Sequence, residues 1–283
     1  MPATKPPTRG EGVHAASRLG PTSEASARLD EALGLGHAVL DLYKQRTVLG
    51  TFLIELPAKT TIKALALGGF DFAILDLEHS SFGVESLPAL ISEAHLLRLP
   101  VLVRISSHDA GLITKVLDAG ANGIMAPHVS TARQAKAIIA AARYAPLGER
   151  GLAPLIGFAE LPRPQVAVDP DILVLVQIEG SEGVANCAEI AAVPGVSGLF
   201  VGPYDLSQAL GIPGDVENPR VAEAAAQVAD RAGAAGMLGV YVHDPRRSAV
   251  WAQRGFRLQC VSFDSRMLLA GAREAVANAR AGG

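Results

Sequence analysis

The chain has 283 residues, of which 49% are hydrophobic, and it carries a formal net charge of -3 at neutral pH. This content suffices to bury one large α/β core, so a second domain is not required. There is no stripe rich in Lys and Arg, which argues against nucleic-acid binding and favours small-molecule partners. Because no run of about 18 apolar residues and no signal-peptide core occurs, we expect a cytoplasmic protein with no membrane partner. The two cysteines, Cys187 and Cys260, are predicted to be reduced core residues.

The N-terminal segment differs in composition from the rest of the chain. Residues 1–24 are rich in Pro, Gly, Ser and Thr and poor in hydrophobic side chains, which predicts a disordered tail. From about residue 25 to residue 46 the hydrophobic positions have loose helical spacing, interrupted by Gly34 and Gly36. We therefore expect a broken helix that covers the bottom of a single domain formed by residues 25–283.

Short apolar runs then alternate with segments of helical spacing along the remaining chain. The eight predicted strands lie near residues 48–54, 71–76, 100–104, 122–126, 172–178, 197–201, 237–242 and 257–262. Strands that are apolar on both faces and separated by helices indicate a parallel sheet, and eight such units close most naturally into a (β/α)8 barrel, or TIM barrel. A doubly wound open sheet is the alternative. The prolines and glycines of residues 144–170 predict a loop at the rim.

Polar side chains stand at the ends of four predicted strands, which is where α/β enzymes carry their chemistry. In chain order they are Asp76 with Glu78 and His79, then Arg104, then Gln177 with Glu179, and finally Asp205. The carboxyl ends of parallel strands meet at one edge. We therefore expect these side chains to gather at one rim of the barrel.

Glu179 and Asp205 are candidate metal ligands, because they follow neighbouring strands and can face each other across the barrel mouth. Two carboxylates, with waters and a chelating substrate, suit the octahedral geometry of Mg²⁺ or Mn²⁺. No local thiolate or histidine pair indicates zinc. The alternative is that both acids only stabilise helix N-termini, since each stands at the start of a predicted helix.

His79 is a candidate general base, because a carboxylate such as that of Asp76 raises the basicity of an imidazole. A loop histidine bonded to backbone is the alternative. Arg104 at a strand end inside a barrel needs an anion, either a substrate carboxylate or a structural partner such as Asp76 or Asp118. No lysine lies within a predicted strand facing the barrel interior, so Schiff-base chemistry is not indicated.

Six ordered motifs within about residues 47–278 resemble the HpcH/HpaI aldolase family, the metal-dependent class II pyruvate aldolases typified by 4-hydroxy-2-oxoheptanedioate aldolase. They are GFDFAILDLEH (69–79), PVLVR (100–104), DAGANGIMAP (118–127), RYAPLGERG (143–151), VQIE (176–179) and GPYDLS (202–207).

This resemblance implies a (β/α)8 barrel, commonly in a hexamer whose protomers exchange the last helix, with Mg²⁺, Mn²⁺ or a similar ion such as Co²⁺ as cofactor. The ion would be bound by Glu179 and Asp205 and chelated by pyruvate, a 2-oxo acid. The implied roles of the other residues are base for His79, support of its basicity for Asp76 and Asp118, enolate stabilisation for Arg104, and substrate binding for Gln177 and the backbone around Tyr204 and Asp205. An aldehyde would be the second partner, giving an aldolase of 4-hydroxy-2-oxo acids.

The segment between Gly151 and Asp171 departs from the family pattern, because it is shorter and less basic than usual. In the family this loop helps to receive the second substrate, so the resemblance leaves the identity of the aldehyde open. A citrate-forming Claisen condensation or an oxaloacetate decarboxylation at the same site is therefore an alternative. A noncatalytic metal and 2-oxo-acid binding protein is another.

Overall fold

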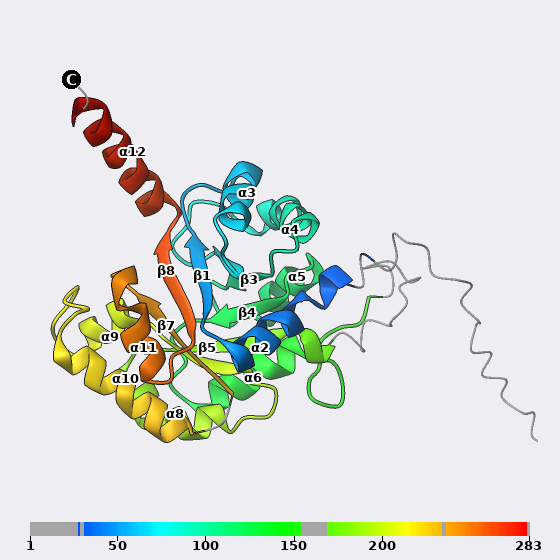
Figure 1. Ribbon diagram of the computed structural model, residues 1–283. Helices are drawn as coiled ribbons and strands as arrows, with labels where there is room; N and C mark the ends of the chain where they lie inside the picture. Colours follow the sequence, from blue (N-terminus) through cyan, green and yellow to red (C-terminus); the bar gives the residue numbers. More distant parts are fainter. Residues whose placement is uncertain (1–27, 29–30, 154–168, 234–235, 282–283) are drawn as a thin grey trace, which may run out of the picture.

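The computed structural model describes residue 28 and residues 31–153, 169–233 and 236–281 (Figure 1). The predicted tail of residues 1–24 and most of the predicted rim loop lie outside these ranges. No helix among the described residues is both long and apolar enough to cross a membrane.

Eight parallel strands form a closed barrel in which β1 pairs with both β2 and β8. The strands are β1 (Val48–Leu53), β2 (Phe72–Asp76), β3 (Val101–Arg104), β4 (Gly123–Ala126), β5 (Leu173–Ile178), β6 (Gly198–Val201), β7 (Met237–Val242) and β8 (Leu258–Phe263). Each lies within one residue of its predicted range. The predicted (β/α)8 barrel is confirmed, and closure between β1 and β8 excludes the open sheet.

The helices surround this barrel (Figure 1). Those between strands are α3 (Lys59–Leu67), α4 (Leu87–Leu96), α5 (Ala110–Asp118), α6 (Ala132–Ala142), α8 (Ser181–Ala191), α9 (Pro203–Ala209), α10 (Pro219–Ala232) and α11 (Ser248–Gln253). Local sequence sets their starts: Thr131 and Gln134 form a reciprocal capping box at α6, for example.

Two hydrophobic layers explain why the strands are apolar on both faces. One buried cluster joins the outer strand faces to the helices, and the other fills the barrel interior, where Phe72, Ile74 and Phe200 are fully buried. Both cysteines are buried and unpaired, as expected.

A helix closes the end of the barrel where the strands begin. Helix α2 (Leu35–Gln45) follows Gly34, and its Val39 belongs to the interior cluster with Val48 and Leu258. Gly36 lies so close to the backbone at Asp171 that a Cβ at position 36 would be 2.0 Å from the carbonyl oxygen of Asp171. With this end closed, the open mouth lies at the carboxyl ends of the strands.

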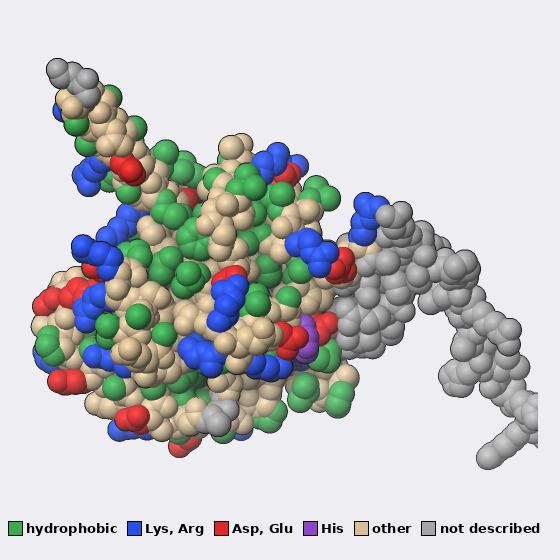
Figure 2. All heavy atoms as spheres, viewed as in Figure 1, with side chains coloured by type: hydrophobic (Ala, Val, Ile, Leu, Met, Phe, Trp, Pro, Cys, Tyr) green, Lys and Arg blue, Asp and Glu red, His purple; other side chains and the backbone are tan. Residues whose placement is uncertain are grey.

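Helix α12 (Asp264–Ala281) extends away from the barrel (Figure 1). Its first residue is fixed, because the Oδ2 of Asp264 accepts hydrogen bonds from the backbone N–H groups of residues 54, 55 and 56 at 3.1, 3.0 and 2.7 Å. Farther along, Leu268, Leu269 and Val276 are exposed. Hydrophobic side chains are visible on this helix in Figure 2, while Lys and Arg side chains on the face drawn there are scattered among other types.

Candidate active site

A cavity of about 330 Å³ opens at the carboxyl ends of the strands. Its polar wall includes His79, which follows β2, Arg104 at the end of β3, Gln177 on β5, and Asp205 in the first turn of α9. Aromatic side chains, among them Phe52, line much of the rest. Residues from four strand ends therefore meet at one mouth, as predicted.

Asp76 and Arg104 form a buried, two-pronged ion pair. The two residues face each other in the register of β2 and β3, and the guanidinium Nε and terminal nitrogen donate to the two carboxylate oxygens at 2.8 and 2.6 Å. Asp76 is fully buried and Arg104 is 8% exposed. Burial opposes the charge on Arg104, but Asp76 and then Glu78 outweigh it and raise the guanidinium pKa. The structural ion pair to Asp76, one of the predicted alternatives, is thus present.

The Arg104 guanidinium is held in position on two further sides. Its carbon lies 4.8 Å from the centre of the Phe52 ring, a cation–π contact. The remaining terminal nitrogen lies 3.3 Å from a carboxylate oxygen of Glu78. A guanidinium oriented in this way can present that nitrogen to an oxyanion in the cavity.

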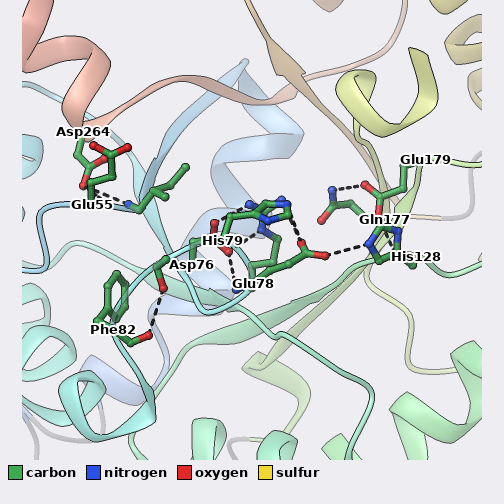
Figure 3. Close-up of polar contacts among 12 residues, drawn as sticks. Glu55, Asp76, Glu78, His79, Phe82, His128, Gln177, Glu179 and Asp264 are labelled. Atoms are coloured by element: carbon green, nitrogen blue, oxygen red, sulfur yellow. Dashed lines mark hydrogen bonds and ion pairs between the residues drawn. The ribbon is translucent and has the colours of Figure 1, made fainter. Parts of the chain in front are cut away.

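Glu78 and His128 connect the two halves of the site, as Figure 3 shows. The carboxylate of Glu78 lies 3.0 Å from Nε2 of His128, whose Nδ1 lies 2.9 Å from Glu179. The backbone N–H of His128 also donates to Glu179, at 2.7 Å. Sequence reasoning placed Glu78 at the rim but gave neither Glu78 nor His128 a specific role, although His128 also stands just beyond the end of a strand.

Glu179 is a carboxylate enclosed by protein. Its side chain is 2% exposed, and its Oε2 accepts a hydrogen bond from the amide of Gln177 at 2.6 Å. Burial raises the pKa of Glu179 to about 7, and the negative charge of Asp205 adds to this effect. The two carboxylates therefore lie near enough to repel each other. Glu179 precedes Gly180, the N-cap of α8, and its carboxylate oxygens contact His128 and Gln177, whereas Asp205 lies in the first turn of α9, where the helix-terminus alternative still applies.

The donor set at this position suits a hard divalent cation. The Oε1 of Gln177 is buried and has no hydrogen-bond partner among the described residues, so an acceptor oxygen lies beside Glu179 without a donor. A cation between Glu179 and Asp205 would offset their repulsion and accept this amide oxygen as well. No group of three or more His, Cys, Asp or Glu side chains in the described part of the chain could hold a metal. Gln177, water or substrate would therefore complete the coordination.

His79 lies on the wall of the same cavity, and its side chain is 59% exposed. The nearest acidic contact is Glu78, at 3.8 Å from Nε2. The carboxylate of Asp76 instead accepts hydrogen bonds from Arg104 and from the backbone N–H of Glu78. His79 is thus accessible to a bound substrate, and the carboxylate beside it is that of Glu78 rather than that of Asp76.

Asp118 lies far from His79 within one chain. The expected support of the basicity of His79 by Asp118 is therefore not seen there. Asp118 ends α5, which leads into β4, so it lies at the opposite end of the barrel from the strand-end residues. There it pairs with Arg150 at 2.7 Å and lines a different cavity of about 590 Å³. Tyr204 lies at the active-site cavity as expected, with its side chain 44% exposed.

Comparison with known proteins agrees with this geometry. A family model described as HpcH/HpaI aldolase/citrate lyase matches residues 51–270. A hydroxypyruvate/pyruvate aldolase from Paraburkholderia phytofirmans is 34% identical over 238 residues, which cover 80% of this chain and 91% of the relative. The solved HpcH/HpaI aldolase from Desulfitobacterium hafniense is similar at a TM-score of 0.79 and 30% identity, over 85% of this chain and 95% of that one. The solved citrate synthase SbnG is similar at a TM-score of 0.78 and 28% identity, over 89% of this chain and 99% of that one. The chain belongs to the HpcH/HpaI aldolase/citrate lyase family.

Proposed function

We propose that this protein is a divalent-metal-dependent aldolase that cleaves or forms 4-hydroxy-2-oxo acids, with pyruvate and an aldehyde as the other reactants. The observation that carries the proposal is that one cavity contains an accessible imidazole, a fixed guanidinium and a carboxylate, those of His79, Arg104 and Asp205, with Glu179 directly behind Gln177. The relation to a hydroxypyruvate/pyruvate aldolase supports the same reaction class.

Glu179 and Asp205 would hold Mg²⁺, Mn²⁺ or a similar ion, with Gln177 beside them. Such an ion, when bound, polarises the ketone of a 2-oxo acid and makes its methyl protons more acidic. Arg104 would stabilise the negative charge that develops on the keto oxygen, and because Asp76 and Phe52 fix the guanidinium in advance, little reorganisation is needed.

His79 would accept the proton from the substrate methyl group and return it in the reverse direction. Its exposure on the cavity wall leaves the imidazole accessible to a bound substrate carbon, and the Glu78 carboxylate lies 3.8 Å from its Nε2. The enolate carbon of pyruvate would then bond to the aldehyde carbon, and the aldehyde oxygen would take up a proton from water. In cleavage, the 4-hydroxyl would lose that proton as the bond between carbons 3 and 4 breaks, which gives the aldehyde and the enolate. Asp118 has no part in these steps within one chain.

Aldehyde release from a 4-hydroxy-2-oxo acid tests this function. We expect cleavage that stops when the metal is chelated and recovers when Mg²⁺ or Mn²⁺ is restored. Replacement of Glu179 by Gln keeps the size of the side chain but removes its charge, so it should lower cleavage by at least about 100-fold. Cleavage that persists in both the chelated enzyme and the Glu179→Gln variant would refute the proposal.

A second candidate function uses the same site for citrate formation or oxaloacetate decarboxylation. Its support is the likeness to the citrate synthase SbnG over 89% of this chain. Side-by-side turnover of a 4-hydroxy-2-oxo acid, oxaloacetate alone and oxaloacetate with acetyl-CoA distinguishes the two. Clear preference for either oxaloacetate reaction would replace the aldolase assignment.

A further inference from the structure

His128 lies between two carboxylates of the site, although it does not itself line the cavity. Its Nε2 is 3.0 Å from Glu78 and its Nδ1 is 2.9 Å from Oε1 of Glu179, as can be followed in Figure 3. The imidazole is 58% exposed, so packing does not fix its orientation. The contacts with the two carboxylates account for that orientation instead.

The backbone at His128 directs a second donor at the same oxygen of Glu179. His128 has φ of 55°, a left-handed conformation that is uncommon outside glycine. In this conformation its backbone N–H donates to Oε1 of Glu179 at 2.7 Å, and the next N–H, that of Val129, donates to the backbone oxygen of Gln177 at 3.2 Å. The loop after β4 is therefore joined to the end of β5 through both backbone and side chain.

These contacts occupy one oxygen of Glu179 and leave the other available. Oε1 receives both contacts from His128, whereas Oε2 accepts one hydrogen bond, from the amide of Gln177. Each carboxylate oxygen has about two acceptor positions, so among the described residues the open position is on Oε2. A Cβ at Gly202 would lie 2.4 Å from Oε2, and Asp205 lies in the helix that follows this glycine. The open position is therefore on the oxygen nearest the turn that leads to Asp205.

The imidazole is anchored on its other side by buried polar groups. One oxygen of Glu78 lies 3.0 Å from His128, and the other lies 3.3 Å from a terminal nitrogen of Arg104, which Asp76 holds in turn. The Glu78 side chain is only 11% exposed. A continuous series of polar contacts thus runs from the ends of β2 and β3 through His128 to Glu179.

We propose that His128 is a positioning residue that holds the Glu179 carboxylate in its metal-binding orientation, with Glu78 as the anchor of the imidazole. Because this role presupposes a cation at Glu179, it rests on the proposed aldolase function and extends that function to a residue outside the cavity. Removal of a group that orients a metal ligand commonly lowers the affinity for the ion by about tenfold or more. His128 would therefore determine how tightly the ion is held without contacting it.

Calorimetric titration of Mn²⁺ into the metal-free protein, without substrate and at about pH 8, measures this role directly. His128→Gly removes the imidazole and tolerates positive φ, so it should lower the affinity by about tenfold or more. His128→Ala serves if the glycine variant folds poorly in scanning fluorimetry. His128→Asn places an amide donor near the position of Nδ1 and also tolerates positive φ, so its affinity should stay within about threefold of the wild-type value.

His37→Ala is the matched control for removal of an imidazole. The ring nitrogens of His37 also lie near two carboxylates, those of Asp41 and Asp171, each at 3.5 Å, and the side chain is 52% exposed. His37 belongs to α2 at the closed end of the barrel, so the affinity for Mn²⁺ should not change.

A double-mutant cycle tests whether Glu78 acts through the imidazole. Glu78→Gln removes a negative charge near the metal site, and a purely Coulombic effect would lower the affinity by the same factor whether or not His128 is present. If Glu78 anchors the ring, the factor lost in Glu78→Gln should be much smaller in the His128→Gly background.

The outcomes separate this role from the proposed function. If the wild type binds Mn²⁺ and His128→Gly binds it equally well, the positioning role alone is overturned. A loss in His128→Asn as large as that in His128→Gly, an equal loss in His37→Ala, or a Glu78→Gln effect of the same size in both backgrounds would also overturn it. If the wild type binds no Mn²⁺, the proposed function fails first, and the role of His128 fails with it.

Discussion

Glu179 is the residue on which the proposed chemistry depends most. Protein surrounds it on all sides, and burial holds its pKa at about 7. A raised pKa means that the folded, metal-free protein binds a proton here at pH values where the unfolded chain does not. Between the usual value of 4.5 and about 7, this group therefore favours folding less as the pH rises. A bound cation favours the deprotonated form of Glu179 instead, because only the charged carboxylate is a good ligand.

The affinity for Mg²⁺ or Mn²⁺ should therefore depend on pH. Below about pH 7 the metal must displace a proton from Glu179, so the affinity should fall by up to about tenfold per pH unit between pH 7 and pH 6. Above about pH 8 it should level off. Isothermal titration calorimetry in two buffers of different ionisation enthalpy would show the released proton. In the Glu179→Gln variant the metal affinity should be low, and no proton should be released on binding. A wild-type metal affinity that does not change from pH 6 to pH 8 would contradict the explanation.

At the scale of elements, the turn between β6 and α9 determines how closely the backbone approaches Glu179 and Gln177, the proposed metal-binding side chains. A Cβ at Gly202 would lie 2.4 Å from Oε2 of Glu179 and 2.9 Å from Nε2 of Gln177. Gly202 has φ of -94°, which any residue can adopt, so close approach rather than backbone conformation requires glycine. The atoms that would have to move are the ends of side chains, so the fold can adjust but the site cannot remain unchanged.

Gly202→Ala should consequently lower metal affinity and aldolase activity by about tenfold or more, while the thermal midpoint of the metal-free protein changes little. Gly180→Ala is the matched control, because Gly180 also precedes a helix, has φ of -133°, and a Cβ there would have no neighbour within 4 Å. Calorimetric metal titration and differential scanning fluorimetry would measure the two effects. Equal losses of metal affinity in both variants would show that the close approach at Gly202 is not the cause.

The elements themselves could be predicted from the sequence because parallel strands covered by helices are apolar on both faces, a pattern that the eight runs display. The location of Arg104 and Asp205 at one rim could also be predicted, because every strand of a parallel barrel ends on the same side. Asp118 could not be placed in this way, because it ends a helix rather than a strand. The link from Glu78 through His128 to Glu179 depends on side-chain conformations that strand periodicity does not determine.

At the scale of the whole molecule, α12 stands out because it extends from the barrel with Leu268, Leu269 and Val276 exposed. Exposed apolar side chains on one helix favour contact with another protein surface. The homo-oligomer expected from the sequence, a hexamer by family likeness, would provide that surface, and together with the cytoplasmic location it stays a prediction.

A charge on α12 should therefore weaken assembly. We expect Leu268→Glu to shift the protein to smaller species in size-exclusion chromatography with light scattering, because a carboxylate buried at an interface is unfavourable. Val250→Glu, at an exposed apolar position on α11, is the control and should leave the mass unchanged. A wild-type protein that is monomeric at micromolar concentration would contradict the prediction.

The most direct test of the central claim is the exchange of pyruvate methyl protons with deuterated water, followed by proton NMR with Mg²⁺ present. It isolates the proposed removal of a proton by His79 from a 2-oxo acid bound near Glu179 and Asp205, and it requires no knowledge of the aldehyde. The wild-type enzyme should exchange these protons, and both His79→Ala and Glu179→Gln should lower the rate by at least about 100-fold. If the wild type binds pyruvate but exchanges none of its protons, or if both variants exchange them at the wild-type rate, the account is contradicted.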